Sequence, residues 1–461
     1  TATPTFLHGT LMAGNYTVPN VYVNVKAVFT NTAPVDAYRG AGRPEATYSI
    51  ERVIDKAARE IGMDPIALRR KNFVKPDQYP FASAAGLEYD SGNYDALMDG
   101  LEARADIAGF EARRAESAKA GKLRGLGINS YIEACGIAPS NLVGVLGSRV
   151  GLYDAATVRV NATGNISVMV GAHSHGQGHE TAFPQVVADM LGVDPMSIDI
   201  VHGDTSKIPF GMGTYGSRSL AVCGSAVFRA TEKIIRKATL IAAHMMEAEA
   251  SDVEFDAPDF TVPGTNKKVP FGDVALKAYI PHNYPIEAIE PGLEETAFYD
   301  PANFTYPAGA YACEVEVDPE TGHVVVDRYT SVDDSGVILN PLLYAGQIHG
   351  GIAMGWGQAL LEQALYDEES GQFLTGSFMD YGMPRADDLP DFNLDHQHIP
   401  CATNPLGIKG AGESGTVGAL PALVNAVLDA LSSLGIEDMD MPLTPSKLWH
   451  AIAAAEQETT R

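Results

Sequence analysis

Cysteine is scarce in this sequence and is not arranged for metal binding. The chain has 461 residues and four cysteines, Cys135, Cys223, Cys313 and Cys401, and no CxxC pair occurs. Structural zinc and iron–sulfur sites need thiolates at close spacing, so neither kind of site is predicted within this chain. We expect the four cysteines to be buried, unpaired thiols in a reducing compartment, and therefore a cytoplasmic protein.

Positive charge and long apolar runs are also limited. The sequence has 32 Lys and Arg against 58 Asp and Glu, which gives a formal net charge of −26. A surface of this charge repels nucleic-acid phosphates, so no nucleic-acid partner is expected. No uninterrupted apolar run of about 18 residues occurs, so no membrane span is predicted.

The common nucleotide-binding motifs are absent as well. The sequence contains no GxxxxGK[ST], and no GxGxxG opens a plain strand–helix–strand unit with a ribose-binding acid after it. A nucleotide hydrolase and a nicotinamide-dependent dehydrogenase are therefore disfavoured.

Glycine, in contrast, is abundant. The chain has 46 glycines, a larger share than the usual figure of about 7%, and they concentrate where a predicted strand passes through a turn into a predicted helix. Four such segments are residues 38–44, 171–181, 345–351 and 408–415. A glycine-rich turn at a helix start lets backbone N–H groups approach an anion. One such turn alone is more simply a tight connection, but four together predict a large anionic ligand held mainly by main-chain amides.

The remaining pattern predicts a folded chain of several packing units. Alternation of apolar and polar residues over 18–30 predicts a half-buried strand, and the spacing from Ile50 to Ile61 predicts an amphipathic helix that ends at Gly62. Residues 318–322 (DPETG) between two alternating runs predict a hairpin. The polar stretch 75–124 is typical of a linker.

A few ionisable and aromatic side chains are candidates for function. Glu413 lies within Gly410–Gly415, where small neighbours allow close approach, so it is either a general base or a solvated acid at a helix start. His173, His175 and His179 have no standard metal-ligand spacing, and we expect structural or ligand-contact roles for them. Met354 and Trp356 lie in a helical pattern and are expected in the core.

Several motifs occur in the order found in one known family. They are AYRGAGRPEA (37–46), GQGHET (176–181), GMGTYGSRS (211–219), Asn340-Pro341 with Gly346-Gln347, Asp380-Tyr381 and GAGES (410–414). The chain thus resembles the molybdenum hydroxylases of the xanthine oxidase family. Specifically, it is similar to the rear portion of a molybdopterin-binding large subunit of the aerobic carbon monoxide dehydrogenase or aldehyde oxidoreductase type.

The resemblance implies an α+β (mixed α/β) fold, in which mixed sheets have flanking helices and glycine-rich strand-to-helix loops. Residues 1–74 would end the first molybdopterin-binding domain and residues 75–124 would be a linker. Residues 125–461 would form the second such domain, with subdomains of about 125–300 and 301–461.

The resemblance also implies a cofactor, molybdenum with molybdopterin cytosine dinucleotide. The metal would be held by the pterin dithiolene, so no protein side chain is expected as a metal ligand. The expected cofactor-binding residues are Arg39, Gly40, Ala41, Gln177, Gly178, His179, Thr181, Thr214, Tyr215, Gly216, Ser217, Arg218, Ser219, Gln347, Lys409, Gly410 and Gly412. Glu413 matches the family's catalytic glutamate, which accepts a proton at the molybdenum centre.

Partner subunits follow from the same resemblance. The family's opening segments are not found upstream of Thr1, so another segment or subunit is expected to carry the front of the molybdenum-binding region. In this family a [2Fe-2S] subunit and an FAD subunit or domain accept the electrons. A dimer of such heteromers is expected.

One departure from the carbon monoxide dehydrogenases bears on the substrate. Those enzymes have a copper-binding cysteine in the loop that here reads Arg39-Gly40-Ala41-Gly42-Arg43, and Cu(I) needs such a soft ligand. We therefore expect water-dependent hydroxylation of a carbon in an aldehyde or N-heteroaromatic substrate. The alternatives are a carbon monoxide dehydrogenase-like large subunit, a non-catalytic cofactor-holding subunit, and a phosphosugar- or nucleotide-binding protein without redox activity.

Overall fold

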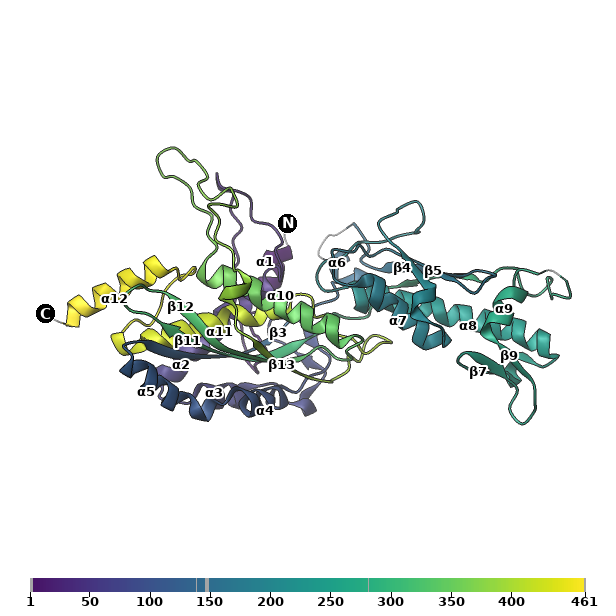
Figure 1. Ribbon diagram of the computed structural model, residues 1–461, viewed down its shortest axis with the longest axis horizontal. Helices are drawn as coiled ribbons and strands as arrows, with labels where there is room; N and C mark the ends of the chain where they lie inside the picture. The colour runs from purple at the N-terminus through teal and green to yellow at the C-terminus, as the bar shows by residue number, and fades with distance from the viewer. Residues whose placement is uncertain (1–2, 138, 146–148, 281, 460–461) are drawn as a thin grey trace.

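The chain folds into two lobes that lie side by side (Figure 1). The computed structural model describes residues 3–137, 139–145, 149–280 and 282–459. One lobe contains the first and last helices of the described chain, and the other is formed by the middle of the chain. Each lobe is built on a four-stranded mixed sheet, which confirms the expected α+β class.

The terminal lobe has the sheet order β13-β12-β11-β3. Its strands are β3 (Leu123–Ile132), β11 (Ala308–Val317), β12 (Val324–Asp334) and β13 (Phe392–Gln397), and its main helices are α10 (Pro341–Leu360) and α11 (Ser414–Leu431). β11 is antiparallel to both β3 and β12, whereas β13 is parallel to β12. The hairpin predicted at residues 318–322 is confirmed, because these residues join β11 to β12, with Val317 opposite Val324.

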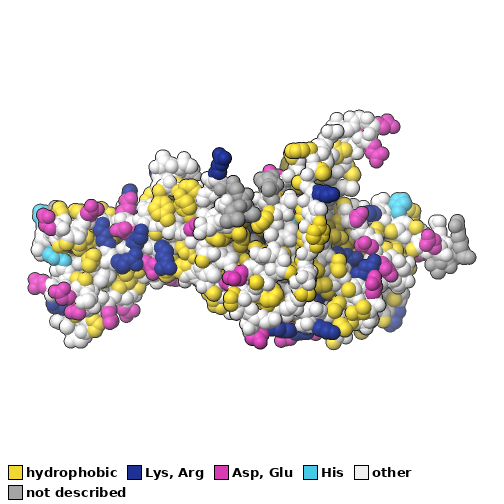
Figure 2. All heavy atoms as spheres, turned by 180° about the vertical axis from the view of Figure 1, so that it is seen from behind, with side chains coloured by type: hydrophobic (Ala, Val, Ile, Leu, Met, Phe, Trp, Pro, Cys, Tyr) yellow, Lys and Arg dark blue, Asp and Glu magenta, His cyan; other side chains and the backbone are white. Residues whose placement is uncertain are grey.

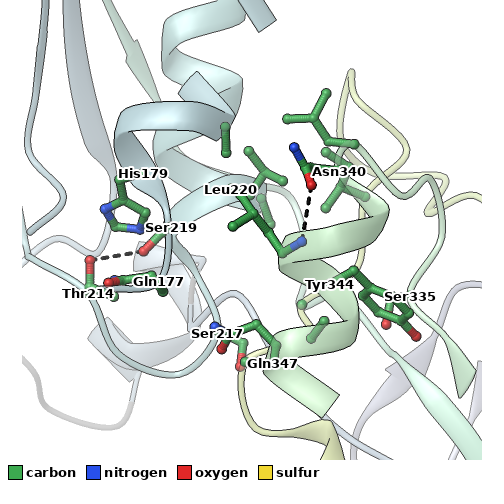
Figure 3. A pocket seen from close by; sticks show the side chains of 18 of the residues that line it. Gln177, His179, Thr214, Ser217, Ser219, Leu220, Ser335, Asn340, Tyr344 and Gln347 are labelled. Carbon is green, nitrogen blue, oxygen red and sulfur yellow. Dashed lines mark hydrogen bonds between the residues drawn. The ribbon is translucent and has the colours of Figure 1, made fainter. Parts of the chain in front are cut away.

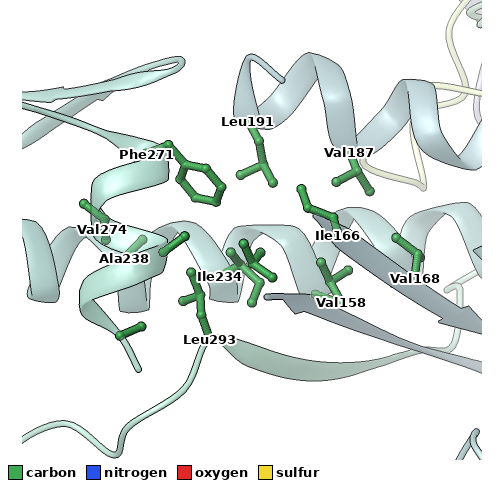
Figure 4. Packing of buried hydrophobic residues seen from close by; sticks show 14 of the residues in the cluster. Val158, Ile166, Val168, Val187, Leu191, Ile234, Ala238, Phe271, Val274 and Leu293 are labelled. Atoms are coloured by element: carbon green, nitrogen blue, oxygen red, sulfur yellow. The ribbon is translucent and has the colours of Figure 1, made fainter. Parts of the chain in front are cut away.

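The middle lobe has the sheet order β10-β4-β5-β6. Its strands are β4 (Asp154–Val160), β5 (Ile166–Val170), β6 (Ile198–Val201) and β10 (Glu294–Tyr299), and its main helices are α7 (His179–Leu191) and α8 (Ser225–Met246). Apolar side chains from α7, α8 and the sheet form one buried cluster, which includes Val158, Ile166, Leu191 and Ile234 (Figure 4).

The two lobes repeat one topology. A hairpin, a helix, a parallel strand and a second helix follow one another as β4-β5-α7-β6-α8 and again as β11-β12-α10-β13-α11. A fourth strand lies antiparallel beside the first hairpin strand in each case, β10 in the middle lobe and β3 in the terminal lobe. The loops before the four helices therefore all leave the carboxyl ends of parallel strands, where open α/β sheets bind ligands.

Shorter elements complete the fold. The other helices are α1 (Thr3–Thr10), α2 (Arg43–Glu60), α3 (Pro65–Asn72), α4 (Tyr94–Ala105), α5 (Phe110–Lys119), α6 (Ser140–Val145), α9 (Phe271–Lys277) and α12 (Pro445–Thr459). Two small antiparallel sheets pair β1 (Phe81–Ala82) with β2 (Glu88–Tyr89), and β7 (Glu254–Asp256) with β8 (Asp259–Thr261) and β9 (Lys268–Pro270). The predicted helix over 50–61 is the second half of α2, and Gly62 follows it with φ +65°.

Helix α11 is the core of the terminal lobe and packs against β3, β11, α2 and α10. With the turn after it, α11 is long and apolar enough to cross a membrane by length and composition, yet most of it is buried inside the lobe. Its approach to α10 is close, since a Cβ at Gly415 would lie 2.5 Å from the carbonyl oxygen of Ile348. These features are those of a core helix. Trp356 is buried in the same core, as expected.

One of the four glycine-rich segments is not a turn. Residues 345–351 lie inside α10, which begins at Pro341 after the capping residue Asn340. Gly351 serves helix packing instead, because a Cβ there would lie 2.8 Å from the Cα of Gly415. The turn prediction was wrong because small residues let two helices approach as readily as they let a loop bend.

The stretch 75–124 does not behave as a linker. It carries α4, whose residues Tyr94, Leu97, Met98 and Leu101 are buried, and α5, which packs beside β3. These side chains belong to a cluster shared with β3, β11 and β12. The apolar face of α4 is only about three turns long, so the surrounding charges and glycines outweighed it in the sequence.

The strand predicted over 18–30 does not form within the described chain. These residues have no strand partner, and Tyr22, Val28 and Phe29 are exposed. With the neighbouring hairpin they project from the terminal lobe as an arm (Figure 1), and hydrophobic side chains line it (Figure 2). We call residues 20–37 and 363–383 the projecting arm; the Ala33 amide donates to the Tyr366 hydroxyl at 2.9 Å and ties its two parts together.

Candidate functional site

A cavity of about 570 Å³ lies between the two lobes (Figure 3). The middle lobe contributes the start of α7 and the residues before α8, and the terminal lobe contributes the start of α10 and the residues before α11. Thus the equivalent loops of the two repeats face each other. The size is within the range of about 300 to 1,000 Å³ that is common for cofactor sites.

At the start of α7, His179 faces the cavity with an unpaired imidazole. Neither Nδ1 nor Nε2 has a hydrogen-bond partner in the described chain, although the residue is buried. Burial lowers the pKa of His179 to about 4, so the ring is neutral near pH 7. A neutral imidazole offers one donor and one acceptor to a polar ligand.

The segment before α8 presents hydroxyl groups on the same wall. The Thr214 hydroxyl accepts from the backbone N–H of His173 at 3.0 Å and bonds to the Ser219 hydroxyl at 3.0 Å (Figure 3). Ser217 adopts a left-handed conformation, with φ +53°. A π-helical turn over Ser219–Gly224 leads into α8, and such turns are frequent at functional sites.

The opposite wall is formed by the loop after β12 and the first turns of α10. Asn340 caps α10 by accepting from the Leu343 amide at 3.0 Å and also donates to Gln185 of α7 at 2.9 Å, which joins the two lobes. Ser335 and Tyr344 line the cavity, and their buried hydroxyl groups have no hydrogen bond of standard geometry in the described chain. Such hydroxyl groups are commonly satisfied by a ligand or ordered water.

Arg39 is the main source of positive charge in the cavity. The Lys409 ammonium lies 2.6 Å from the Asp334 carboxylate in a fully buried ion pair, so its charge is neutralised. Arg39 donates to the Gly412 carbonyl at 2.6 Å and to the Gln347 carbonyl at 3.0 Å. Burial lowers the pKa of Arg39, and the nearby carboxylates of Glu413 and Glu133 oppose this effect.

Glu413 immediately precedes α11 and is held at both carboxylate oxygens. Oε1 accepts from the Gly40 amide at 3.0 Å and lies 2.7 Å from Nη2 of Arg43. Oε2 accepts from the Ser217 hydroxyl at 2.8 Å. The side chain is 12% exposed and lines the cavity, so it can exchange a proton with a bound molecule. This arrangement favours the general base over the solvated helix-start acid.

Two glycines allow close packing around the cavity. At Gly178, which caps α7 with φ +84°, a Cβ would lie 2.6 Å from Leu343. At Gly216, with φ +59°, a Cβ would lie 2.2 Å from Ile137. Neither position accepts a side chain without movement of its neighbour. Helix α7 therefore begins in close contact with Leu343 of α10, and its first residue, His179, lines the cavity.

Most of the predicted site residues meet at this cavity. Those that line it are Arg39, Gln177, His179, Thr214, Tyr215, Gly216, Ser217, Ser219, Gln347, Lys409, Gly410, Gly412 and Glu413. Gly40, Ala41 and Gly178 lie behind the lining, and of these Gly40 touches Glu413 through its amide. Although the third glycine-rich segment is helical, its residue Gln347 still reaches the cavity.

Two predicted residues are placed differently. Thr181 is exposed in the first turn of α7. Arg218 is fully buried, donates to the Leu152 carbonyl and lies 3.4 Å from Asp154, so its side chain stabilises the loop from behind. The glycine-rich motif predicts a ligand contact for Arg218, whereas the described contacts of its guanidinium are with the Leu152 carbonyl and Asp154.

Some residues of the site were missed from the sequence. Ser335 and Tyr344 follow β12 in a stretch without a glycine motif, and only the Asn340-Pro341 helix start marks that place. Arg43 and Glu133, which adjoin Glu413, are fully buried ionisable residues. The signal for Glu133 was available, because it is a carboxylate at the end of the apolar run of β3.

The three histidines and the four cysteines differ in exposure. His175 and His179 line the cavity, and His173 and His175 are exposed. All four cysteines are buried and free. Within the described residues, the one group of possible metal-binding side chains is Glu133, Cys135 and Glu413, which includes no histidine.

Comparison with known proteins gives the family. Two profiles described as molybdopterin cofactor-binding domain match residues 101–390 and 1–73. The carbon monoxide dehydrogenase large chain of Hydrogenophaga pseudoflava is 39% identical over 449 residues, which are 96% of this chain and 55% of that protein. The nicotine 6-hydroxylase large subunit of Paenarthrobacter nicotinovorans is 36% identical over 439 residues, 95% of this chain and 53% of that protein.

A solved structure agrees with these relatives. Quinoline 2-oxidoreductase from Pseudomonas putida 86 is similar with a TM-score of 0.92 at 35% identity, over 98% of this chain and 57% of that chain. The chain spans about half the length of the curated relatives it matches. It belongs to the molybdopterin-binding domains of the xanthine oxidase family.

Proposed function

We propose that this chain holds molybdenum with molybdopterin cytosine dinucleotide and supplies the catalytic base of a molybdenum hydroxylase. The reaction is the hydroxylation of a carbon of an aldehyde or N-heteroaromatic substrate, with water as the source of oxygen. The observation that carries this proposal is the position of Glu413, a fixed carboxylate that lines a cavity whose walls combine apolar side chains with mostly uncharged polar groups.

The donor set of the cavity fits a pterin dinucleotide. The unpaired imidazole of His179 and the unpaired hydroxyls of Ser335 and Tyr344 suit a polar heterocycle or its phosphates. The start of α7 at Gly178 suits a pyrophosphate without a lysine. The cofactor, when bound, supplies an acidified oxygen nucleophile and accepts the electron pair.

In this proposal Glu413 holds and moves one proton. Oε2 is the oxygen that accepts the proton, because its partner is the neutral hydroxyl of Ser217. Oε1, in contrast, is bound by Gly40 and Arg43. Gly40, Arg43 and Ser217 keep the carboxylate in one orientation, so no reorganisation is needed when the proton is transferred.

The residues around position 40 favour this substrate class over carbon monoxide. No thiol is present in the loop from Arg39 to Arg43, and a Cβ at Gly40 would lie 2.2 Å from Pro44, so a larger residue there needs a different loop. The sulfur of Cys135 lies 3.8 Å from Nη1 of Arg43, and burial holds the pKa of this thiol well above the usual value. A thiol kept protonated is a poor ligand for Cu(I).

Electron transfer and assembly complete the proposal. The electrons pass to a [2Fe-2S] subunit and an FAD subunit, and the whole is a cytoplasmic dimer of heteromers. A further segment or subunit, equivalent to the part of the relatives that this chain does not span, covers the projecting arm. The support for this partner is the arm itself, where strand-like residues have no strand partner and Phe29 and Phe378 are exposed.

The deciding experiment is substrate-dependent dye reduction by the purified complex, with molybdenum content determined on the same sample. Purines, pyridines, quinolines, aldehydes and carbon monoxide are compared for the wild type and Glu413→Gln. We expect turnover of an aldehyde or N-heterocycle, and a loss of about 10² to 10⁴-fold in the variant at unchanged molybdenum content. Glu60→Gln, on the exposed end of α2, is the control.

Each alternative has its own outcome in that experiment. Copper-dependent turnover of carbon monoxide would establish the carbon monoxide dehydrogenase-like reading. Bound molybdenum without turnover of any substrate would indicate a cofactor-holding subunit. A complex without molybdenum would contradict the proposed cofactor. The phosphosugar- or nucleotide-binding protein without redox activity would then be the remaining alternative.

A further inference from the structure

A second carboxylate lies behind Glu413. Glu133 immediately follows β3, is fully buried and does not line the cavity. Between the two carboxylates lies the guanidinium of Arg43, also fully buried, at the start of α2. Nη1 of Arg43 is 3.0 Å from Oε1 of Glu133, and Nη2 is 2.7 Å from Oε1 of Glu413. One cation is thus shared by two anions.

The guanidinium is fixed by further bonds. Its Nη1 donates to the Ala134 carbonyl at 2.7 Å, and its Nε donates to the Gly40 carbonyl. Burial opposes the charge on Arg43, but the carboxylates of Glu413 and Glu133 outweigh this effect and raise its pKa. Arg43 therefore remains charged, and its orientation determines how strongly this charge acts on each of the two carboxylates.

Glu133 is also joined to the helix start that carries Glu413. The hydroxyl of Ser414, the first residue of α11, donates to Oε2 of Glu133 at 3.2 Å. Ser414 follows Glu413 directly in the chain. Glu133 consequently acts on Glu413 from two directions, through Arg43 and through the backbone at Ser414.

The charged and titratable groups around Glu133 come from each element packed against it. They are Arg43 of α2, Arg39 of the preceding loop, Glu413 before α11, and Tyr131 and Cys135 on either side in the chain. Burial raises the pKa of Glu133 to about 7; Arg43 opposes this rise and Glu413 adds to it. Glu133 therefore changes charge close to neutral pH.

A metal ion is not the explanation of this cluster. Ligand atoms of Glu133, Cys135 and Glu413 lie within 4.8 Å of one another. However, Arg43 already lies between the two carboxylates and 3.8 Å from the Cys135 sulfur. A divalent cation at the same place would meet an immovable positive charge.

We infer that Glu133 is a positioning residue that tunes the base: by sharing Arg43 it fixes the guanidinium against Glu413 and, when ionised, draws positive charge away from it. The inference rests on the proposed role of Glu413. With Glu133 neutral, the charge of Arg43 acts on Glu413 alone and makes it a weaker base. With Glu133 ionised, Glu413 is a stronger base, so turnover has an additional rise near neutral pH.

Glu133→Gln tests this inference because glutamine resembles the protonated acid in shape. In the assembled holoenzyme at matched molybdenum content, kcat of the variant should equal that of the wild type at pH 6. It should fall roughly three- to tenfold behind at pH 8.5, where the wild type has gained the stronger base. Glu133→Asp, which keeps the charge, should retain the rise.

The matched control is Glu51→Gln. Glu51 is a fully buried acid on α2 that pairs with Arg69 at 2.8 Å, and burial raises its pKa as well, but it does not touch Glu413. A loss of stability alone would affect Glu51→Gln as much as Glu133→Gln. The control should retain the pH profile of the wild type.

Two measurements keep the test independent of that one variant. Ser414→Ala removes a hydrogen bond that lowers the pKa of Glu133, so the rise should move to higher pH. Infrared difference spectra of the complex between pH 6 and 8.5 should contain a carboxylic C=O band of Glu133 beside that of Asp333, another buried acid with a pKa of about 7. The Glu133 band should be present in Glu51→Gln and missing in Glu133→Gln.

The outcomes separate this inference from the proposed function. Parallel pH profiles for the wild type and Glu133→Gln, or equal changes in Glu133→Gln and Glu51→Gln, would overturn the positioning role. An unchanged infrared band in Glu133→Gln would overturn it as well. Full activity of Glu413→Gln would instead contradict the proposed base, whatever Glu133 does.

Discussion

The backbone amide of Gly40 donates to Oε1 of Glu413 at 3.0 Å, across 373 positions of sequence. This single bond links the loop before α2 to the start of α11, and it depends on a backbone with φ +103° at Gly40. The family motif around residue 40 therefore serves the carboxylate directly, as well as the cavity wall.

Gly40→Ala should disturb this bond. A Cβ at residue 40 would meet Pro44 at 2.2 Å, so the loop must shift and carry the amide away from Glu413. Loss of a hydrogen bond to a charged group costs about 1.5 to 3 kcal/mol, and we expect kcat to fall roughly 10- to 100-fold. Gly62→Ala is the control, since it has φ +65° but open space around it. Equal losses in both variants would argue for backbone strain alone.

His179 should govern cofactor loading. His179→Leu keeps the apolar volume but removes both nitrogens, which have no other partner in the described chain. With about 0.5 to 1.5 kcal/mol per hydrogen bond, the molybdenum content after dialysis should fall roughly two- to tenfold. His323→Leu, exposed in the β11–β12 hairpin, should leave it unchanged.

The same residue predicts how loading depends on pH. Burial lowers the pKa of His179 to about 4, so the ring stays neutral at every pH above about 5. Molybdenum retention that His179 supports should therefore be constant between pH 5.5 and 8. A step in wild-type retention near pH 6.5 that His179→Leu abolishes would contradict a neutral imidazole.

Most residues of the site could be predicted from the sequence, because the glycine-rich motifs are short continuous segments. Loops such as 211–219 and 410–414 need backbone conformations that only a few residue types adopt. They can therefore be located in the sequence without knowledge of the fold. Gln347 was identified by its motif even though the supposed turn around it is helical. The α+β class was implied by the resemblance of these motifs to one family.

What could not be predicted depends on contacts between distant elements. The repeated topology is invisible in sequence because equivalent strands share only their apolar character, and the β5–α7 and β12–α10 loops differ in composition. The pairing of Lys409 with Asp334, and of Arg43 with both glutamates, joins elements that meet only in the folded chain. The arm had a strand pattern without the partner that a strand needs.

A buried acid in the terminal lobe should make stability depend on pH. Asp333 accepts from the hydroxyls of Tyr131 at 2.5 Å and Tyr311 at 2.9 Å, and burial raises its pKa to about 7. The folded chain thus keeps a proton that the unfolded chain releases near pH 4. The stabilisation from this group is complete below pH 4 and is lost as the pH rises to about 7.

Asp333→Asn should remove that dependence, because asparagine still accepts from the two tyrosines and never ionises. The free energy of unfolding of the variant relative to wild type should rise by a few kcal/mol, at about 1.4 kcal/mol per pKa unit, between pH 4 and 8. Chemical denaturation at pH 4, 5, 6, 7 and 8 measures it. Asp387→Asn, in an exposed turn, should follow the wild type, and a pH-independent offset for Asp333→Asn would refute the assignment.

The projecting arm should be covered in the assembled enzyme. Val28 is 76% exposed in an extended segment whose amides have no strand partner in the described chain, so a strand of the proposed further segment or subunit can pair with it. Hydrogen exchange of residues 20–30 in the purified complex should then be as slow as in β3. Rapid exchange there would show that nothing pairs with the arm.

Val28→Lys should reduce the recovery of intact complex and its molybdenum content at least several-fold, because a charge would be buried in the contact. Val53→Lys, on the exposed face of α2 with 63% exposure, is the matched control and should assemble normally.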